Sequence, residues 1–370
     1  MTQFDRKFPI DWLTKAVLSE NPWFRDLLRY WRPAGDAVGA SRGSGEASLG
    51  RCSEAKSDLK ILRVAFRNNY MNFYCGGQSL AKVNFGRDGL QAKIHNKYVY
   101  GDKGGGQEYI KLTSAGFRER ETGRLVPYTG FDQWIKNAKE YGGREKHFVD
   151  LLVAHNPNVI DLEMGLPAYS TVPGENHAPR MDLVALEPKN GWWQIVFWEA
   201  KLVGDERARC SGDRLPKVVT EQLQPYRDWL NHGDHLKTVA QAYEQNCRLL
   251  VDLHKVACAA RLGIDKLGRG IQEVADRNER PLLVDEKPRL LIIYDEADQA
   301  FRNKHLDKLQ DAGWRVKVVE RARDLDSKWP LDPHSDCSPW HAADRWQLHR
   351  DRAPAGRPYH PGRRASAGCP

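Results

Sequence analysis

The sequence lacks three features that would place it in a class at once. It has no apolar run of about 18 residues, no unbroken apolar segment behind its first residues and no CxxC pair. The first two absences disfavour a membrane-spanning helix and a signal peptide. The seven cysteines are far apart and odd in number, which disfavours a paired-cysteine zinc module or a disulfide scaffold, and we expect a cytoplasmic protein.

Several catalytic motifs are missing too. The chain has no HExxH and no GxxxxGK[ST] phosphate loop. The last absence matters for the segment 290–298, where an apolar run followed by acids imitates the acidic strand end of ATPases. Such a site needs a phosphate loop to hold the nucleotide, so we interpret this run as a buried strand ended by Asp295 as a helix N-cap.

The chain that remains has 370 residues, of which 41% are hydrophobic, and a formal net charge of +8 from 57 basic and 49 acidic residues. Its length predicts about two domains, and its charge permits a polyanionic partner without requiring one. We predict five segments, in chain order: N-terminal helices (1–32), a flexible linker rich in Gly, Ser and Ala (33–58), an antiparallel β-meander (59–130), an α/β domain (131–322) and a disordered, basic, proline-rich tail (323–370).

The predicted meander mixes basic and aromatic residues. These are Arg63, Arg67, Lys82, Arg87 and Lys93, interleaved with Phe66, Tyr70, Phe73 and Tyr74. Such interleaving can hold a nucleic-acid backbone, but it is also typical of a half-buried sheet with a solvated face. Together with the N-terminal helices, the meander is our candidate for selecting a substrate or a protein partner.

From residue 131 onward, helical and strand-like segments alternate, which predicts an α/β sheet covered on both sides. The segment 192–202 is apolar on both faces until Glu199 and Lys201, which indicates a central strand with two charged residues on one face of its end. Charges there are costly to desolvate unless they are compensated. They form either a structural ion pair or part of a site in which a divalent metal takes the carboxylate.

Two more carboxylates fit the same place. If 181–186 and 192–202 pair as a hairpin around Lys189-Asn190-Gly191, Asp182 converges with Glu199 at one end of the sheet. Neighbouring carboxylates repel unless a cation separates them, and oxygen ligands suit Mg²⁺ or Mn²⁺. Glu145 shares a helical stripe with apolar residues that face the sheet, although a carboxylate at that helix N-terminus is also favoured by the helix dipole.

A fourth element lies downstream. Gln222 and Tyr226 are four residues apart on a predicted helix, and a Gln on an apolar stripe suggests a partner inside a cleft. Pro225 complicates this helix, because its ring would clash with the carbonyl of Glu221 and would kink the helix or delay its start.

In this order, helix Glu145, strand Asp182, strand Glu199-Ala200-Lys201 and helix Gln222-x-x-x-Tyr226, the residues resemble the PD-(D/E)XK nuclease superfamily, in its RecB-like branch with the QxxxY motif. The resemblance covers about residues 143 to 230. It implies a restriction-endonuclease-like mixed central sheet flanked by helices. The chain departs from many RecB-like members in the Arg180-Met181 that precedes Asp182, in Pro225, and in having no counterpart of the iron–sulfur cysteines of some relatives.

The resemblance also implies roles. Asp182, Glu199 and the Ala200 carbonyl would hold Mg²⁺ (or Mn²⁺), with Glu145 bound directly or through water. Lys201 would position the attacking water or offset negative charge. Gln222 and Tyr226 would orient the substrate or Lys201, and Arg180 would contact the substrate.

We therefore expect a Mg²⁺-dependent nuclease that hydrolyses phosphodiester bonds, in DNA rather than RNA. Two alternatives stay open. One is a catalytically inactive, nuclease-like nucleic-acid-binding or adaptor protein, which a structure with Lys201 at the metal position would favour. The other is a buried Glu199–Lys201 ion pair in a core of unrelated purpose.

Overall fold

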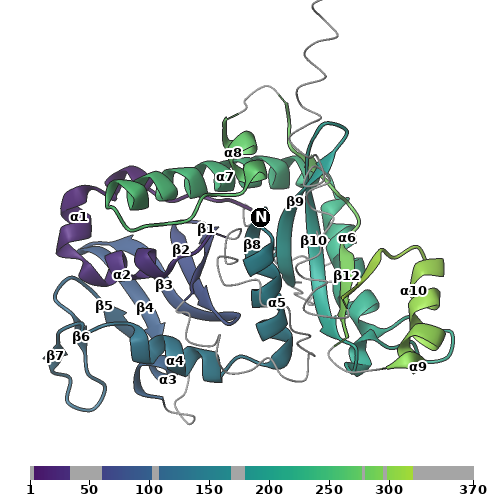
Figure 1. The fold of residues 1–370 in the computed structure, drawn as a ribbon, viewed down its shortest axis with the longest axis horizontal. Coiled ribbons are helices and arrows are strands. Elements are labelled where there is room, and N and C mark those ends of the chain that lie inside the picture. The colour runs from purple at the N-terminus through teal and green to yellow at the C-terminus, as the bar shows by residue number, and fades with distance from the viewer. Residues whose placement is uncertain are drawn as a thin grey trace, which may run out of the picture. The chain divides into compact units, whose positions relative to one another are not determined.

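Two large β-sheets, one antiparallel and one mixed as expected, organise the described residues, beside a small two-stranded sheet (Figure 1). The computed structural model describes residues 4–33, 61–101, 108–167, 180–276, 280–294 and 298–319. The predicted linker, apart from Pro33, and the predicted tail lie outside these residues, as does Asp295. The described residues belong to one compact unit. None of its described helices has the length and apolar character needed to cross a membrane.

The N-terminal segment forms the two predicted short helices, α1 (Lys15–Glu20) and α2 (Pro22–Tyr30), after a 3-10 turn (Ile10–Trp12). The Thr14 side chain caps α1 by accepting from the Val17 N–H, and Pro22 opens α2 directly after Asn21. The amphipathic α2 buries Trp23, Phe24 and two leucines in the larger of two hydrophobic clusters, which we call the main core.

The predicted meander is confirmed as a five-stranded antiparallel sheet. Its strands pair in chain order: β1 (Arg63–Arg67), β2 (Tyr70–Cys75), β3 (Gln78–Gly86), β4 (Gly89–His95) and β5 (Tyr109–Leu112). Two helices and two short strands complete this region: α3 (Asn96–Tyr100), β6 (Phe117–Arg118), β7 (Leu125–Val126) and α4 (Asp132–Glu140). Asn69 and Gly77, both at positive φ, make the turns on either side of β2.

The second sheet is mixed and confirms the predicted α/β region. Its order is β13-β12-β10-β9-β8, and β11 also pairs with β10. The strands are β8 (Val159–Gly165), β9 (Arg180–Lys189), β10 (Trp192–Leu202), β11 (Leu283–Val284), β12 (Arg289–Ile293) and β13 (Val316–Val319). Strands β8, β9 and β10 are antiparallel neighbours, whereas β12 is parallel to β10 and β13 is parallel to β12.

Helices cover both faces of this sheet, as expected. They are α5 (Arg144–His155), the 3-10 turn Glu206–Ala208, the π-helix Val218–Leu223, α6 (Gln224–Leu230), α7 (His235–Ala259), α8 (Arg269–Asp276), α9 (Gln299–Phe301), the π-helix Arg302–Leu306 and α10 (Asp307–Asp311). Val149 and Leu152 of α5 share a core cluster with Val196 of β10, and Tyr226 of α6 shares the other cluster with Phe197. Alternate residues of β10 thus enter different cores, which is why both of its faces are apolar.

Candidate active site

The hairpin β9–β10 brings two of the predicted site residues, Asp182 and Glu199, close together. Asn190 and Gly191 both have positive φ, the geometry of a tight two-residue hairpin turn. The register that follows ends with Trp198 opposite Leu183, so the next positions along the two strands are Glu199 and Asp182. The Asp182 carboxylate accepts a hydrogen bond from the Ala200 N–H at 2.8 Å, which ties the two strand ends together.

Lys201 joins two of the carboxylates. Its ammonium donates to Glu199 Oε1 and to the Ala200 carbonyl (2.7 Å), and it lies 3.7 Å from Glu145 Oε1. Glu145 reaches this point from the first turn of α5, whose buried Val149 packs against the sheet. Three carboxylates and one ammonium, carried by three elements, therefore meet at one end of the mixed sheet.

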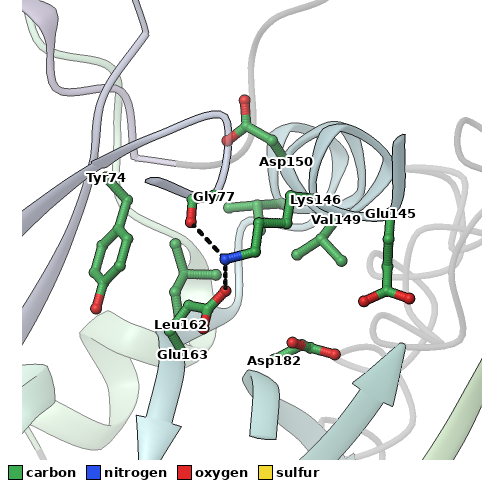
Figure 2. Close-up of a pocket in the computed structure, with 10 residues that line it drawn as sticks. Tyr74, Gly77, Glu145, Lys146, Val149, Asp150, Leu162, Glu163 and Asp182 are labelled. Carbon is green, nitrogen blue, oxygen red and sulfur yellow. Dashed lines mark hydrogen bonds and ion pairs between the residues drawn. The ribbon is translucent and has the colours of Figure 1, made fainter. Parts of the chain in front are cut away.

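Figure 2 shows the acidic pocket beside this site, which Glu145, Asp182, Glu163 and Tyr74 help to line. Glu145 at the start of α5 and Asp182 on its strand lie on the same side of that pocket. The Glu145 side chain is 25% exposed, whereas the side chains of Glu199 and Lys201 are only 2–3% exposed. The site is consequently open at Glu145 and closed at Glu199.

Negative charge is under-compensated here. Burial, and next the neighbouring Asp182, raise the pKa of Glu199 to about 8, although Lys201 acts in the opposite direction. Burial likewise raises the pKa of Asp182 and that of Glu145. Glu199 Oε2 is buried and accepts no hydrogen bond from any residue that the structure describes. A buried carboxylate oxygen without a donor is unfavourable, and it marks a place where a further cation would be stabilised.

The Lys201 ammonium is held by these same acids. Burial alone would lower its pKa, but Glu199, Asp182 and Glu145 together raise it, so Lys201 stays charged at neutral pH. Its partners Glu199, the Ala200 carbonyl and Glu145 are three of the four groups expected to bind a metal. The lysine is thus the counter-ion of the cluster in this structure.

The chemical type of these donor atoms suits a hard divalent ion. All four groups offer oxygen, which Mg²⁺ and Mn²⁺ prefer, and Glu199 Oε2 is an acceptor without a donor. Across the described residues, no three His, Cys, Asp or Glu side chains are close enough together to form a metal-binding group. With Lys201 turned toward Glu199, the carboxylates are neighbours but do not converge on one point.

The other predicted pair, Gln222 and Tyr226, lies beside the site without touching its acids. Pro225 does not break this helix, because the wider π-helix Val218–Leu223 precedes it and leaves Pro225 in the first turn of α6. Tyr226 is fully buried, its ring centroid lies 5.2 Å from that of Phe197, and its hydroxyl donates to the Met164 sulfur at 3.3 Å. Gln222 is half-buried within the π-helix. Tyr226 thus packs against β10 at Phe197, two residues before Glu199 on the same face of the strand.

The pocket next to the acids contains a group that the sequence did not reveal. Glu163 in β8 has φ 49°, unusual for a residue with a side chain, and its carboxylate binds Lys146 at 3.0 Å and Arg180 at 2.9 Å. Lys146 also donates to the Gly77 carbonyl of the meander, as Figure 2 shows. Arg180 therefore lies at the pocket rim, held by Glu163. No sequence signal marked Glu163, since a positive φ at a glutamate has no local signature.

Comparison of the chain with family models, with curated proteins and with solved structures gives no match to any of them.

Proposed function

We propose that this protein is a Mg²⁺-dependent nuclease that hydrolyses phosphodiester bonds, with its active site at the shared end of β9 and β10. The observation that carries the proposal is the meeting of Glu145, Asp182, Glu199 and Lys201. These residues lie up to 56 positions apart in the chain, yet Lys201 contacts Glu199 and Glu145, and Asp182 binds the backbone between Glu199 and Lys201. A structural ion pair alone would need neither the extra acids nor an orphaned oxygen.

The finer fold assignment belongs to the same proposal. We take α5, the antiparallel strands β8–β9–β10, the π-helix with α6, and the parallel strand β12 to be a restriction-endonuclease-like core. In support, each residue of the motif lies on the expected type of element: Glu145 on a helix, Asp182 and Glu199 on paired strands, and Tyr226 on the next long helical segment.

In this proposal, Asp182, Glu199 and the Ala200 carbonyl would hold the metal, and Glu145 would bind it directly or through water. A bound Mg²⁺ supplies an acidified water and stabilises negative charge on the phosphate. Lys201 releases its contact with Glu199 and offers its three donors to the attacking water or to a phosphate oxygen. Arg180 and Lys146, held by Glu163, attract the phosphates that flank the scissile bond, and Gln222 faces the substrate from the π-helix.

The decisive experiment pairs cleavage with metal binding. A labelled DNA substrate is incubated with the wild-type chain, Glu199→Gln and Lys201→Met in Mg²⁺ or in chelator, and Mn²⁺ binding is followed by calorimetry. We expect cleavage by the wild type in Mg²⁺ only, loss of cleavage in both variants, and loss of Mn²⁺ binding in Glu199→Gln alone. Mg²⁺-dependent cleavage that survives both substitutions rules out this site.

One observation favours a second candidate, a nuclease-like protein that binds nucleic acid without cutting it. The Lys201 ammonium contacts the same oxygens that a metal would need. If that contact is permanent, the wild type binds no Mn²⁺ and cuts nothing, whereas Lys201→Met, which removes the internal counter-ion, gains Mn²⁺ binding. Under the nuclease proposal the wild type binds Mn²⁺ already, so the calorimetry separates the two candidates.

A further inference from the structure

The face of the meander that is turned away from the main core carries a row of lysines. Strand pairing places Asn72, Lys82, Lys93 and Lys111 directly opposite one another on β2, β3, β4 and β5. Directly opposed residues lie on the same face of a sheet. All three lysines are exposed, and at about 4.8 Å between strands they form a line roughly 10 Å long.

The neighbouring row shows which face this is. Phe66, Met71, Val83, Ala92 and Leu112 are opposed in the same way, and all are buried in the main core. The lysines, each next to one of these residues in the sequence, must therefore point outward. The sheet thus has one apolar face and one face with three aligned positive charges.

Like charges directly opposite each other destabilise a sheet, so the row has an energetic cost in the free protein. Within the described residues, no carboxylate pairs with Lys82 or Lys93. Lys111 has one exposed ion pair, with Asp88 at 3.2 Å, and such pairs contribute little. Burial, and next the charge of Lys93, lower the pKa of Lys82. An anionic partner would relieve this repulsion.

Aromatic rings flank the row. The Lys82 ammonium lies 3.8 Å from the centroid of the Tyr70 ring, and Tyr109, opposite His95, is 54% exposed with its ring centroid 5.0 Å from that of the histidine. Tyr70 is only half-exposed, whereas the exposed Tyr109 ring can stack a base while the lysine ammonium groups hold phosphates. A base in a duplex has no free face, so this combination favours a single strand.

The row also leads toward the candidate active site. Asn72 is opposed to Ala65 of β1, and Ala65 packs in the same core cluster as Val149 of α5. Tyr74, on the same face of β2 as Asn72, lines the pocket that contains Glu145 and Asp182. One face of the meander thus carries lysines on its outer strands and a wall of the acidic pocket on its inner ones.

We infer that Lys82, Lys93 and Lys111, with Tyr70 and Tyr109, bind the backbone and bases of single-stranded nucleic acid and direct it toward the acidic pocket. Binding here does not depend on the proposed hydrolysis, because the row belongs to the other sheet and needs no metal.

The test measures binding without catalysis. The full chain carrying Asp182→Asn, in chelator, is titrated into a labelled 20-nucleotide oligo-dT, and fluorescence anisotropy gives Kd at several salt concentrations. We compare the triple variant Lys82→Gln/Lys93→Gln/Lys111→Gln with a matched triple of exposed helical lysines, Lys15→Gln/Lys237→Gln/Lys304→Gln. Both triples remove three positive charges, so only the position of the charges differs.

We expect the sheet triple to weaken binding at least about tenfold and to reduce the slope of log Kd against log salt by about 2, whereas the helical triple changes Kd less than about twofold. The sheet triple should unfold no earlier on heating, since it removes repulsion. Tyr109→Ala should weaken binding about fivefold or more. Equal effects of the two triples overturn the inference, and tighter binding of a duplex than of oligo-dT overturns its single-strand part.

Discussion

Two buried acidic centres in this protein differ in how their charge is balanced. Asp161, fully buried in β8, is bound by Arg6 at 2.9 Å and Arg67 at 2.5 Å, and it also accepts from the Tyr243 hydroxyl and the Leu162 N–H. At the end of β9 and β10, the Lys201 ammonium contacts two of the three clustered carboxylates, and no described group donates to Glu199 Oε2. The first centre is saturated, and the second is not.

The pKa shifts record the same difference. Burial acts to raise the pKa of Asp161, but Arg67 and Arg6 outweigh it and hold that pKa below its ordinary value. Glu199 is buried equally well, yet its pKa rises to about 8. A saturated centre stabilises a fold, whereas a centre with surplus acceptors has room for a cation from outside. This comparison separates an acid whose charge is balanced from one whose charge is under-compensated within one sheet.

The largest expected effect is the loss of activity in Asp182→Asn. The substitution keeps the shape of the side chain and removes a charge from the cluster, so we expect Mg²⁺-dependent DNA cleavage to fall by roughly a thousandfold or more, about 4 kcal/mol in the activation barrier. The matched control is Glu187→Gln. Glu187 is another buried acid of β9, but it pairs with Arg289 at 2.7 Å. Equal losses in both variants would mean that the cluster has no special role.

Asp161→Asn should unfold the protein most easily among single substitutions at the saturated centre. It leaves the buried Arg6 and Arg67 without their counter-charge, which we expect to cost about 3 kcal/mol or more in the free energy of unfolding. Urea denaturation measures the loss, with Asp265→Asn, a half-buried partner of Arg32 at 3.6 Å, as a control expected to change by less than about 0.5 kcal/mol. A neutral outcome at Asp161 would remove the contrast drawn above.

The two centres should respond to pH in opposite directions. The folded protein binds the Glu199 proton more tightly than the unfolded chain does, so this stabilisation is complete below about pH 4.5 and is lost as pH rises to about 8. Asp161 stabilises the fold above its ordinary pKa, and this contribution is lost as pH falls. In chelator, stability should decline between pH 5 and 8 by on the order of 1–3 kcal/mol.

Glu199→Gln should remove most of this decline in stability. Mn²⁺ should also reduce the decline in the wild type, whereas it should leave the stability of the variant unchanged. Denaturation midpoints across this pH range, with and without Mn²⁺, provide the measurement. A wild-type profile that is already flat in chelator would show that Lys201 fully neutralises Glu199.

The smallest effect is expected for Tyr226→Phe. The Tyr226 hydroxyl is buried against a sulfur, a weak acceptor, and makes no contact with Lys201 in this structure. Its removal should change stability by about 1 kcal/mol or less and kcat by less than about twofold. A tenfold loss of kcat, with KM unchanged, would instead mean that the hydroxyl turns toward the reacting groups during catalysis.

Local patterns went far in predicting this fold. Turn residues predicted the meander and the β9–β10 hairpin, because Asn-Gly and Gly-Gly adopt positive φ at little cost. Helical spacing predicted which side of α5 packs on the sheet. The π-helix before Pro225 was not predictable, since a proline signals a helix start or a kink but not a wider turn upstream.

The partners of the charged residues were harder to predict from the sequence. Two of the five basic residues noted in the meander serve the fold: Arg67 binds Asp161, and the buried Arg63 lies 3.6 Å from Asp150. Lys82 and Lys93 remain exposed, and Lys111 joins them only through strand register. Nothing local distinguishes an arginine that will meet a buried acid from one that will face water.

The sequence by itself determined the two sheets, the central position of β10 and the identity of the acids at its end, because periodicity and turn chemistry act between near neighbours. Only the tertiary structure decided which acids are neutralised, that Lys201 serves as counter-ion to two of them, and that three lysines align on one face. The reason is physical: the free energy of a buried charge depends on the donors that surround it, and those donors come from distant parts of the chain.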